Sequence, residues 1–180
     1  MKLHNKIVLL AVTGFFLSGC FANPSLSSAI KNSREGDRLF SSGKIDKAIE
    51  KWAESLEYKQ NAGLNAGLYE KIITAVMLKN DLAEAKKWTC RGLTYFPNNV
   101  NLAFNLALIE FYGENLKGSL DALERVLNLN KYYPNAHFLK GLIYEKTGDK
   151  ISARKEFVSE ININPGSKGA WQKLRGSKND

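Results

Sequence analysis

The sequence is poor in the residues that most metal sites and many catalytic sites require. It contains only two cysteines and two histidines in 180 residues. Two cysteines are too few for a disulfide framework or a four-cysteine zinc site. His4 lies in a segment that we expect to be removed, and His137 alone cannot complete most histidine-based metal sites or a catalytic triad. We therefore expect no catalytic residues, no metal and no cofactor.

Signals for β-strands are also nearly absent, whereas apolar residues recur with a helical period. The chain is 44% hydrophobic and 11% aromatic, which is too apolar for a disordered protein. Its formal net charge is +8, but basic and acidic residues are interspersed, as between Lys44 and Lys47. Mixed signs are typical of solvated helix faces and not of a nucleic-acid-binding stripe. The composition therefore predicts a helical protein that binds no nucleic acid.

The first residues have the layout of an export signal. Lys2 and Lys6 precede an apolar run from Ile7 to Leu17, which is too short to span a bilayer permanently. Small residues then lead to Cys20. We expect residues 1–19 to be removed, which leaves 24 basic and 18 acidic residues and a net charge of +6.

The stretch Leu17-Ser18-Gly19-Cys20 resembles the end of a bacterial lipoprotein signal. The resemblance implies that Cys20 receives a diacylglycerol, that cleavage occurs just before it and that the new amine is acylated. Three acyl chains would anchor the protein stably, because each buried methylene contributes roughly 0.8 kcal/mol. Phe21 stands where an aspartate would favour the inner membrane, so we expect the outer membrane, facing the periplasm. The alternative is an ordinary cleaved signal with a chance cysteine.

The rest of the chain contains an internal repeat. Small residues recur with spacings of 37, 34 and 34 residues, at Ala48, Ala85, Ser119 and Ala153. Four residues after these lie Trp52, Thr89, Leu123 and Phe157, and twelve residues before them lie Gly36, Ile73, Ala107 and Gly141. Agreement at several offsets over four copies indicates a repeat architecture.

The period and the residue types resemble the tetratricopeptide repeat (TPR). The fourth copy carries the pattern best, through Gly141, Tyr144, Gly148, Ala153, Phe157 and Pro165. The middle copies depart from it at Ile73, Thr89 and Glu110. The resemblance implies an all-α, right-handed superhelical solenoid of about four helix-turn-helix repeats plus a C-terminal capping helix. Within it, Gly43 and Gly148 should end first helices in a left-handed conformation.

We expect four parts along the chain. Residues 1–19 are the lipoprotein signal and 20–28 are the lipidated cysteine and a flexible tether. Four repeats occupy 29–167, divided into 29–65, 66–99, 100–133 and 134–167, and 168–180 form the capping helix and tail. Three extra residues around 61–65 should lengthen the first inter-repeat loop, and Pro97 and Pro165 should stop second helices. In the cap, Trp171 and Leu174 should share the buried face while Lys173 and Arg175 face water.

Members of this family commonly bind a peptide or helix on the concave face, which first helices line. Positions four apart share a face of a helix, and here they are polar in the first half (Ser33 with Asp37, Glu70 with Thr74) and apolar in the second. The candidate partner-binding residues are Met77, Phe104, Leu108, Phe111, Tyr112, Phe138 and Leu142. The alternative is that these aromatics pack against neighbouring helices. Asn105 and Asn135 alone do not make the carboxylate clamp of some family members.

Two reactive side chains have ordinary interpretations. We expect His137, on a first helix, to be packed or solvated, because no second histidine can partner it. Cys90 is expected to be a half-buried thiol, with an intermolecular disulfide as the alternative.

These observations predict a membrane-anchored adaptor or assembly factor without enzymatic activity. Its partner would be a protein of the cell envelope and not a small-molecule substrate. A pilotin-like lipoprotein of type IV pilus biogenesis is the alternative, although such proteins usually carry more repeats. A ligand-binding component of a transporter or an enzyme is less favoured, because the chain has no phosphate loop, nucleophile elbow or metal motif.

Overall fold

The protein is described here from a computed structural model, which defines residues 24–58 and 65–176. The expected signal, its cleavage and Cys20 lie outside the described residues, as does most of the loop around 61–65. They therefore stay predictions.

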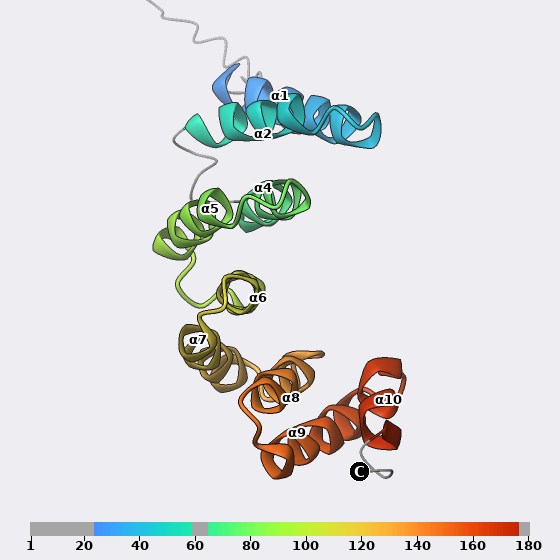
Figure 1. The fold of residues 1–180 in the computed structure, drawn as a ribbon. Helices are drawn as coiled ribbons and strands as arrows, with labels where there is room; N and C mark the ends of the chain where they lie inside the picture. Colours follow the sequence, from blue (N-terminus) through green and yellow to red (C-terminus); the bar gives the residue numbers. More distant parts are fainter. Residues whose placement is uncertain (1–23, 59–64, 177–180) are drawn as a thin grey trace, which may run out of the picture.

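All regular secondary structure in the described residues is α-helical, which confirms that part of the expectation. The helices are α1 (Pro24–Ser41), α2 (Ile45–Glu57), α4 (Ala66–Leu78), α5 (Leu82–Tyr95), α6 (Val100–Tyr112), α7 (Leu116–Leu129), α8 (Ala136–Lys146), α9 (Lys150–Ile163) and α10 (Lys168–Gly176). They form antiparallel pairs stacked in an arc, with α1 and α2 at one end and α10 at the other (Figure 1). We call α1, α4, α6 and α8 the first helices and α2, α5, α7 and α9 the second helices.

The four turns within the pairs share one backbone device. Equivalent positions of the four first helices hold Gly36, Ile73, Ala107 and Gly141. The seventh residue after each of them has a positive φ: Gly43 (75°), Asn80 (59°), Glu114 (60°) and Gly148 (84°). The expectation for Gly43 and Gly148 is confirmed, and Asn80 and Glu114 adopt the same conformation without glycine. A left-handed residue ends a helix and reverses the chain, so all four pairs form in the same way.

The other helix ends also follow local chemistry. Five helices start behind a side chain that accepts a backbone N–H of the first turn: Asn65, Asp81, Asn99, Asn115 and Asp149. Helices α5 and α9 end two residues before Pro97 and Pro165, as expected, because proline lacks the N–H that would continue a helix.

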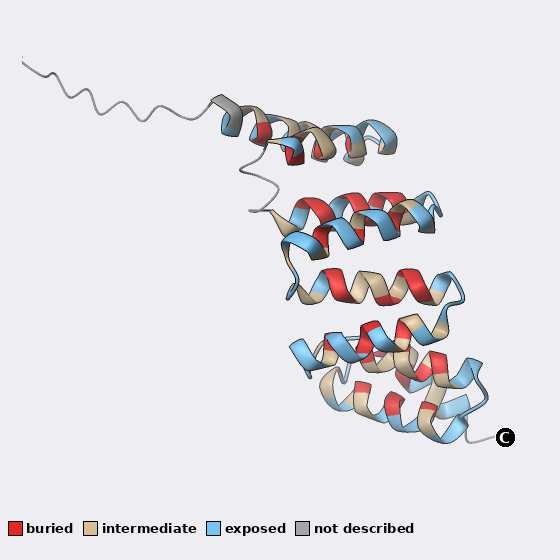
Figure 2. Cartoon of the chain, turned by 90° about the vertical axis from the view of Figure 1, so that its left-hand side faces the viewer, coloured by how far each residue is buried: buried red, intermediate tan, exposed pale blue. Residues whose placement is uncertain are grey.

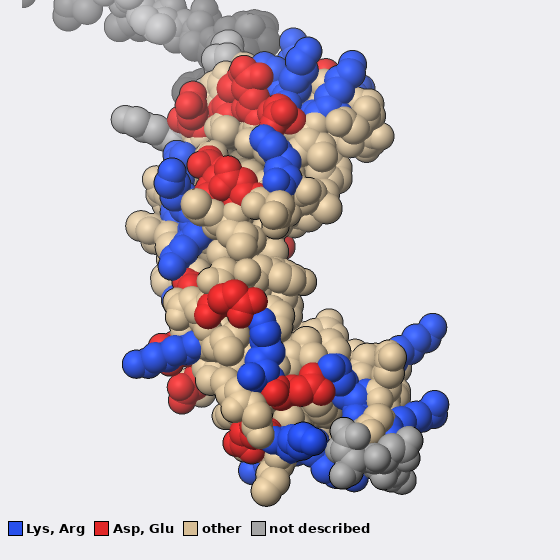
Figure 3. Space-filling model, viewed as in Figure 1, with Lys and Arg blue, Asp and Glu red and all other residues tan. Residues whose placement is uncertain are grey.

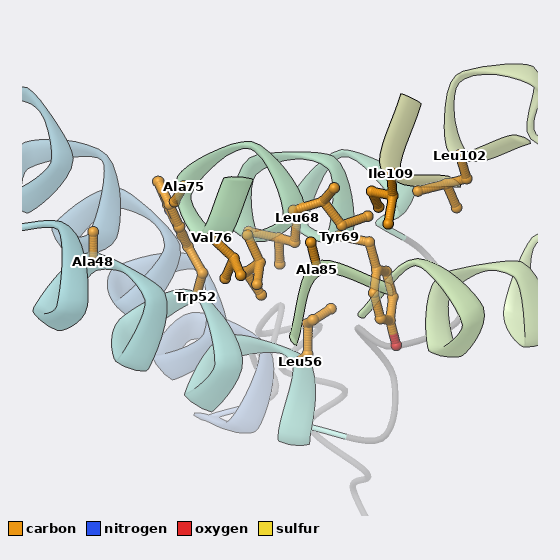
Figure 4. Packing of buried hydrophobic residues seen from close by; sticks show 12 residues of the cluster. Ala48, Trp52, Leu56, Leu68, Tyr69, Ala75, Val76, Ala85, Leu102 and Ile109 are labelled. Atoms are coloured by element: carbon orange, nitrogen blue, oxygen red, sulfur yellow. The ribbon is translucent and has the colours of Figure 1, made fainter. Parts of the chain in front are cut away.

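The core lies between stacked pairs and continues along the arc. At the N-terminal end, Trp52 and Leu56 of α2 pack with Tyr69 and Ile72 of α4 and with Leu102 of α6 (Figure 4). Buried residues follow the inner sides of the stacked helices, and the turns are exposed (Figure 2). No helix within residues 24–58 and 65–176 has both the length and the hydropathy that a membrane span needs.

Two local expectations are wrong. The tether predicted for residues 20–28 is helical from Pro24 onward, because proline is tolerated in the first turn of a helix and Ala29, one turn later, is fully buried. In the cap, the buried residue is Ala170, with Leu174 packed beside it, whereas Trp171 is 44% exposed. Lys173, which was expected to face water, forms an ion pair with Glu145 of α8.

Candidate functional site

The concave side of the arc contains a hollow between α4 and α6. Its volume is about 400 Å³. The lining residues come from the last two turns of α4, the following turn, the start of α5 and the second half of α6: Thr74, Met77, Leu78, Asn80, Leu82, Asn105, Leu108 and Tyr112. Every one of them is uncharged at neutral pH, so the hollow presents apolar surface with a few hydrogen-bonding groups.

Two large apolar side chains in this hollow are left in water. Leu78 is 65% exposed and Tyr112 is 59% exposed, and each belongs to the last turn of its first helix. Exposed apolar side chains that occur singly need no explanation, but ones that converge on a concave surface are typical of interaction sites.

The structure divides the seven predicted groove residues into two sets. Met77, Leu108 and Tyr112 line the hollow, and of these Met77 and Leu108 also pack in part against the core. The other four contact neighbouring side chains: the ring of Phe104 lies 5.0 Å from that of Tyr133, Phe138 lies 5.8 Å from Phe157, Phe111 lies 5.7 Å from Tyr112, and Leu142 packs against two core clusters. Their part in binding stays a prediction.

The prediction missed Leu78, Asn80 and Leu82 and gave no binding role to Asn105. A signal for Leu78 was present in the sequence. It stands five residues after Ile73, as Tyr112 stands five residues after Ala107. The repeat offset that places Tyr112 on the concave side therefore places Leu78 there too.

The polar side chains in the first half of the concave side form ion pairs and hydrogen bonds with one another. Asp37 of α1 forms a 2.6 Å ion pair with Lys71 of α4, and Glu70 accepts hydrogen bonds of 3.3 Å from Asn101 of α6. Burial, with the nearby charge of Glu70, raises the pKa of Tyr133, whose hydroxyl donates to Asn101 at 2.9 Å. On the face shown in Figure 3, acidic and basic side chains are intermixed.

Neither His137 nor Cys90 lines the hollow. His137 Nδ1 lies 2.6 Å from Glu156 Oε2, so the imidazole is packed against a carboxylate. Within the described residues, no three side chains of the metal-binding types are grouped to hold an ion. Cys90 is exposed and not half-buried as expected, because its neighbour Thr89 takes the inward position.

Stacked helix pairs, left-handed turns at a constant offset and a terminal single helix together define a TPR solenoid. Solved structures agree with this fold. MamA has a TM-score of 0.73 and 22% identity over 85% of this chain and 82% of its own. A tetratricopeptide repeat protein from Parabacteroides merdae has a TM-score of 0.74 and 18% identity, over 85% of this chain and 62% of its own. The predicted fold class is therefore confirmed.

A third structure is described as YrrB, a TPR protein with an unusual peptide-binding site. It has a TM-score of 0.66 and 22% identity over 87% of this chain and 78% of its own. No protein-family model matches the chain, and no curated protein matches it significantly. At these identities the likeness establishes the fold alone.

Proposed function

We propose that this protein is a non-catalytic adaptor that holds a segment of a partner protein on its concave face. The observation that carries the proposal is the hollow between α4 and α6, which the exposed side chains of Leu78 and Tyr112 line together with Met77 and Leu108. The peptide-binding site for which YrrB is described supports the same use of the fold. Truncating a central aromatic in such a contact commonly costs about 2 kcal/mol, roughly thirtyfold in affinity.

A matched pair of tyrosines tests this proposal. Tyr112 lines the hollow and is 59% exposed, whereas Tyr132 is 62% exposed and is not among the lining residues. A photo-crosslinking amino acid in place of Tyr112, in the native host, should give a discrete crosslinked product that the same residue at position 132 does not give. Leu108→Ser should remove that product. Equal products at both positions, or one that Leu108→Ser leaves intact, would contradict the proposal.

We further propose that the adaptor is held at a membrane by lipid on Cys20 and serves an assembly of the cell envelope, at the periplasmic side of the outer membrane. The support is the signal-like layout that ends at Cys20. Only residues 21–23 separate Cys20 from the start of α1, so the N-terminal end of the arc would lie close to the bilayer.

The anchor has its own test. Cys20→Ser should abolish labelling by a fatty-acid analogue and should change the membrane fractionation of the protein. Cys90→Ser is the control, because Cys90 is exposed but lies on the helical repeat, and it should leave labelling unchanged. Labelling that persists in Cys20→Ser would exclude this anchor.

A further inference from the structure

The contact region between two neighbouring first helices is called a seam, and the seams differ in whether an ion pair crosses them. With α10 counted as the next helix in the row, ion pairs bridge three of them: Asp37 with Lys71, Glu114 with Lys146, and Glu145 with Lys173. The seam between α4 and α6 has no ion pair among the described residues. The Glu70 carboxylate bonds Asn101 near the starts of the two helices, and the hollow lies toward their ends.

The repeat explains why this seam differs. Glu114 lies 2.7 Å from Lys146, and the two residues are 32 apart in the chain. One repeat earlier, the same positions are Asn80 and Tyr112, which both line the hollow. Asn80 and Glu114 also have nearly the same backbone conformation, with φ of 59° and 60°. Asn80 and Tyr112, which are neutral, therefore occupy in the α4–α6 seam the positions that the ion pair occupies in the α6–α8 seam.

From this we infer that the α4–α6 seam accepts uncharged, apolar side chains of the partner segment. The inference rests on the proposed function and specifies its chemistry. A charged side chain inserted there would lose its hydration without gaining an opposite charge from the lining. The amides of Asn80 and Asn105 can instead bond the backbone of the segment.

The charges that flank the hollow strengthen this assignment. Lys79, next to two lining residues, pairs with Asp46, and Glu114 pairs with Lys146. The Glu70 carboxylate, on α4, accepts hydrogen bonds from Asn101. In the space-filling view, the edge of the molecule between α4 and α6 is mostly uncharged (Figure 3). Although the whole chain has a net charge of +8, binding in the seam should depend little on salt, because screening weakens only interactions between charges.

The decisive variant closes the seam by copying its neighbour. Asn80→Glu with Tyr112→Lys should install the ion pair of Glu114 and Lys146 across the hollow. The left-handed position tolerates glutamate, as Glu114 itself demonstrates. The mirror variant, Glu114→Asn with Lys146→Tyr, removes the neighbouring ion pair and leaves the hollow open, so it is the matched control. If the closing variant does not fold by circular dichroism, Tyr112→Lys alone places a charge in the hollow at an exposed position and gives the same prediction.

The probe is a random-peptide display library selected on the full chain, followed by fluorescence anisotropy of single enriched peptides. We expect uncharged apolar residues at their centre, affinities that change less than about threefold between low and high salt, and at least roughly tenfold weaker binding to the closing variant but not to the mirror variant. Enriched peptides that are acidic or basic and salt-sensitive, or that bind the closing variant equally, would overturn the inference and leave the adaptor function standing. Failure to enrich any peptide would count against the adaptor function itself.

Discussion

The outer helix pairs and the middle helix pairs solve the same packing problem with different residues. In the outer pairs, a glycine on the first helix faces an aromatic on the second. A Cβ at Gly36 would lie 2.5 Å from the Trp52 ring, and one at Gly141 would lie 2.5 Å from the Phe157 ring. In the middle pairs, the equivalent first-helix and second-helix positions are occupied by Ile73 with Thr89 and by Ala107 with Leu123. All four residues are fully buried.

The difference shows that the repeat conserves the combined size of two side chains and not their identity. A large second residue occurs with glycine, an intermediate one with alanine, and the small Thr89 with the large Ile73. Close-packed interiors require this complementarity, because both voids and overpacking are destabilising. Thr89 also donates its hydroxyl to the carbonyl of Ala85 at 2.8 Å, so its burial leaves no unpaired polar group.

Replacing the glycine–aromatic combination of an outer pair by the isoleucine–threonine combination of a middle pair should have the largest effect on the free energy of unfolding. Gly36→Ile alone should cost about 3 kcal/mol by overpacking, and Trp52→Thr alone about 3 to 5 kcal/mol through the cavity it leaves. The double variant, which transplants the combination of Ile73 and Thr89, should cost at least ~1 kcal/mol less than the sum of the two. Urea unfolding followed by circular dichroism measures all three free energies.

A distant combination provides the control for this exchange. Gly36→Ile with Phe157→Thr combines the same types of change in opposite ends of the arc, where no partner is shared, so its two costs should add. If the neighbouring double variant is also additive, the compensation between first-helix and second-helix residues does not exist.

The fold could be predicted from the sequence because its determinants recur at fixed offsets, even where Ile73 and Thr89 break the residue pattern. The site could be predicted only in part. Phe104 and Leu108 share a helix face, yet Tyr133 packs against the first and the hollow admits the second. Periodicity assigns a face, whereas the neighbouring side chains decide how much of it stays open.

The tether was mispredicted for a related reason. The composition from Ala22 to Ser28 is that of a linker, but burial of Ala29 against the next helix stabilises one more turn toward Pro24. Ser55 of α2 donates to the Ala29 carbonyl at 2.8 Å and fixes this turn. A long-range contact of this kind has no local sequence signal.

A second comparison concerns two buried carboxylates, Glu156 in the last pair and Glu110 in a middle pair. Burial alone would raise the pKa of Glu156, but hydrogen bonds from His137 and Lys140 outweigh it and lower the pKa. Burial opposes the shift at Glu110 as well, where Lys86 and Asn115 lower the pKa. Because the pKa is lower in the folded state, each group stabilises the fold above its unfolded value of about 4.3, and the contribution is lost as the pH falls through the folded value.

Glu156→Gln and Glu110→Gln should therefore each lower the free energy of unfolding by about 1 to 2 kcal/mol near pH 7. The deficit relative to the unsubstituted protein should shrink as the pH falls below about 4, since the native carboxyl is then protonated as well. Urea unfolding of both variants across this pH range gives the comparison. A deficit that stays constant with pH would show that packing, and not ionisation, accounts for the loss.

The smallest effect should come from the turns, where glycine in the outer pairs again contrasts with other residues in the middle pairs. Gly148 has a φ of 84°, and a Cβ built there would meet no atom within 4 Å, so Gly148→Ala should cost only the backbone strain of about 1 kcal/mol. Asn80→Gly should change the free energy of unfolding by less than ~0.5 kcal/mol, because the relief of strain is offset by the greater entropy of glycine in the unfolded chain. Thermal unfolding of both variants tests this ranking. A larger loss for Asn80→Gly would mean that the Asn80 side chain, and not only its backbone conformation, stabilises the turn beside the hollow.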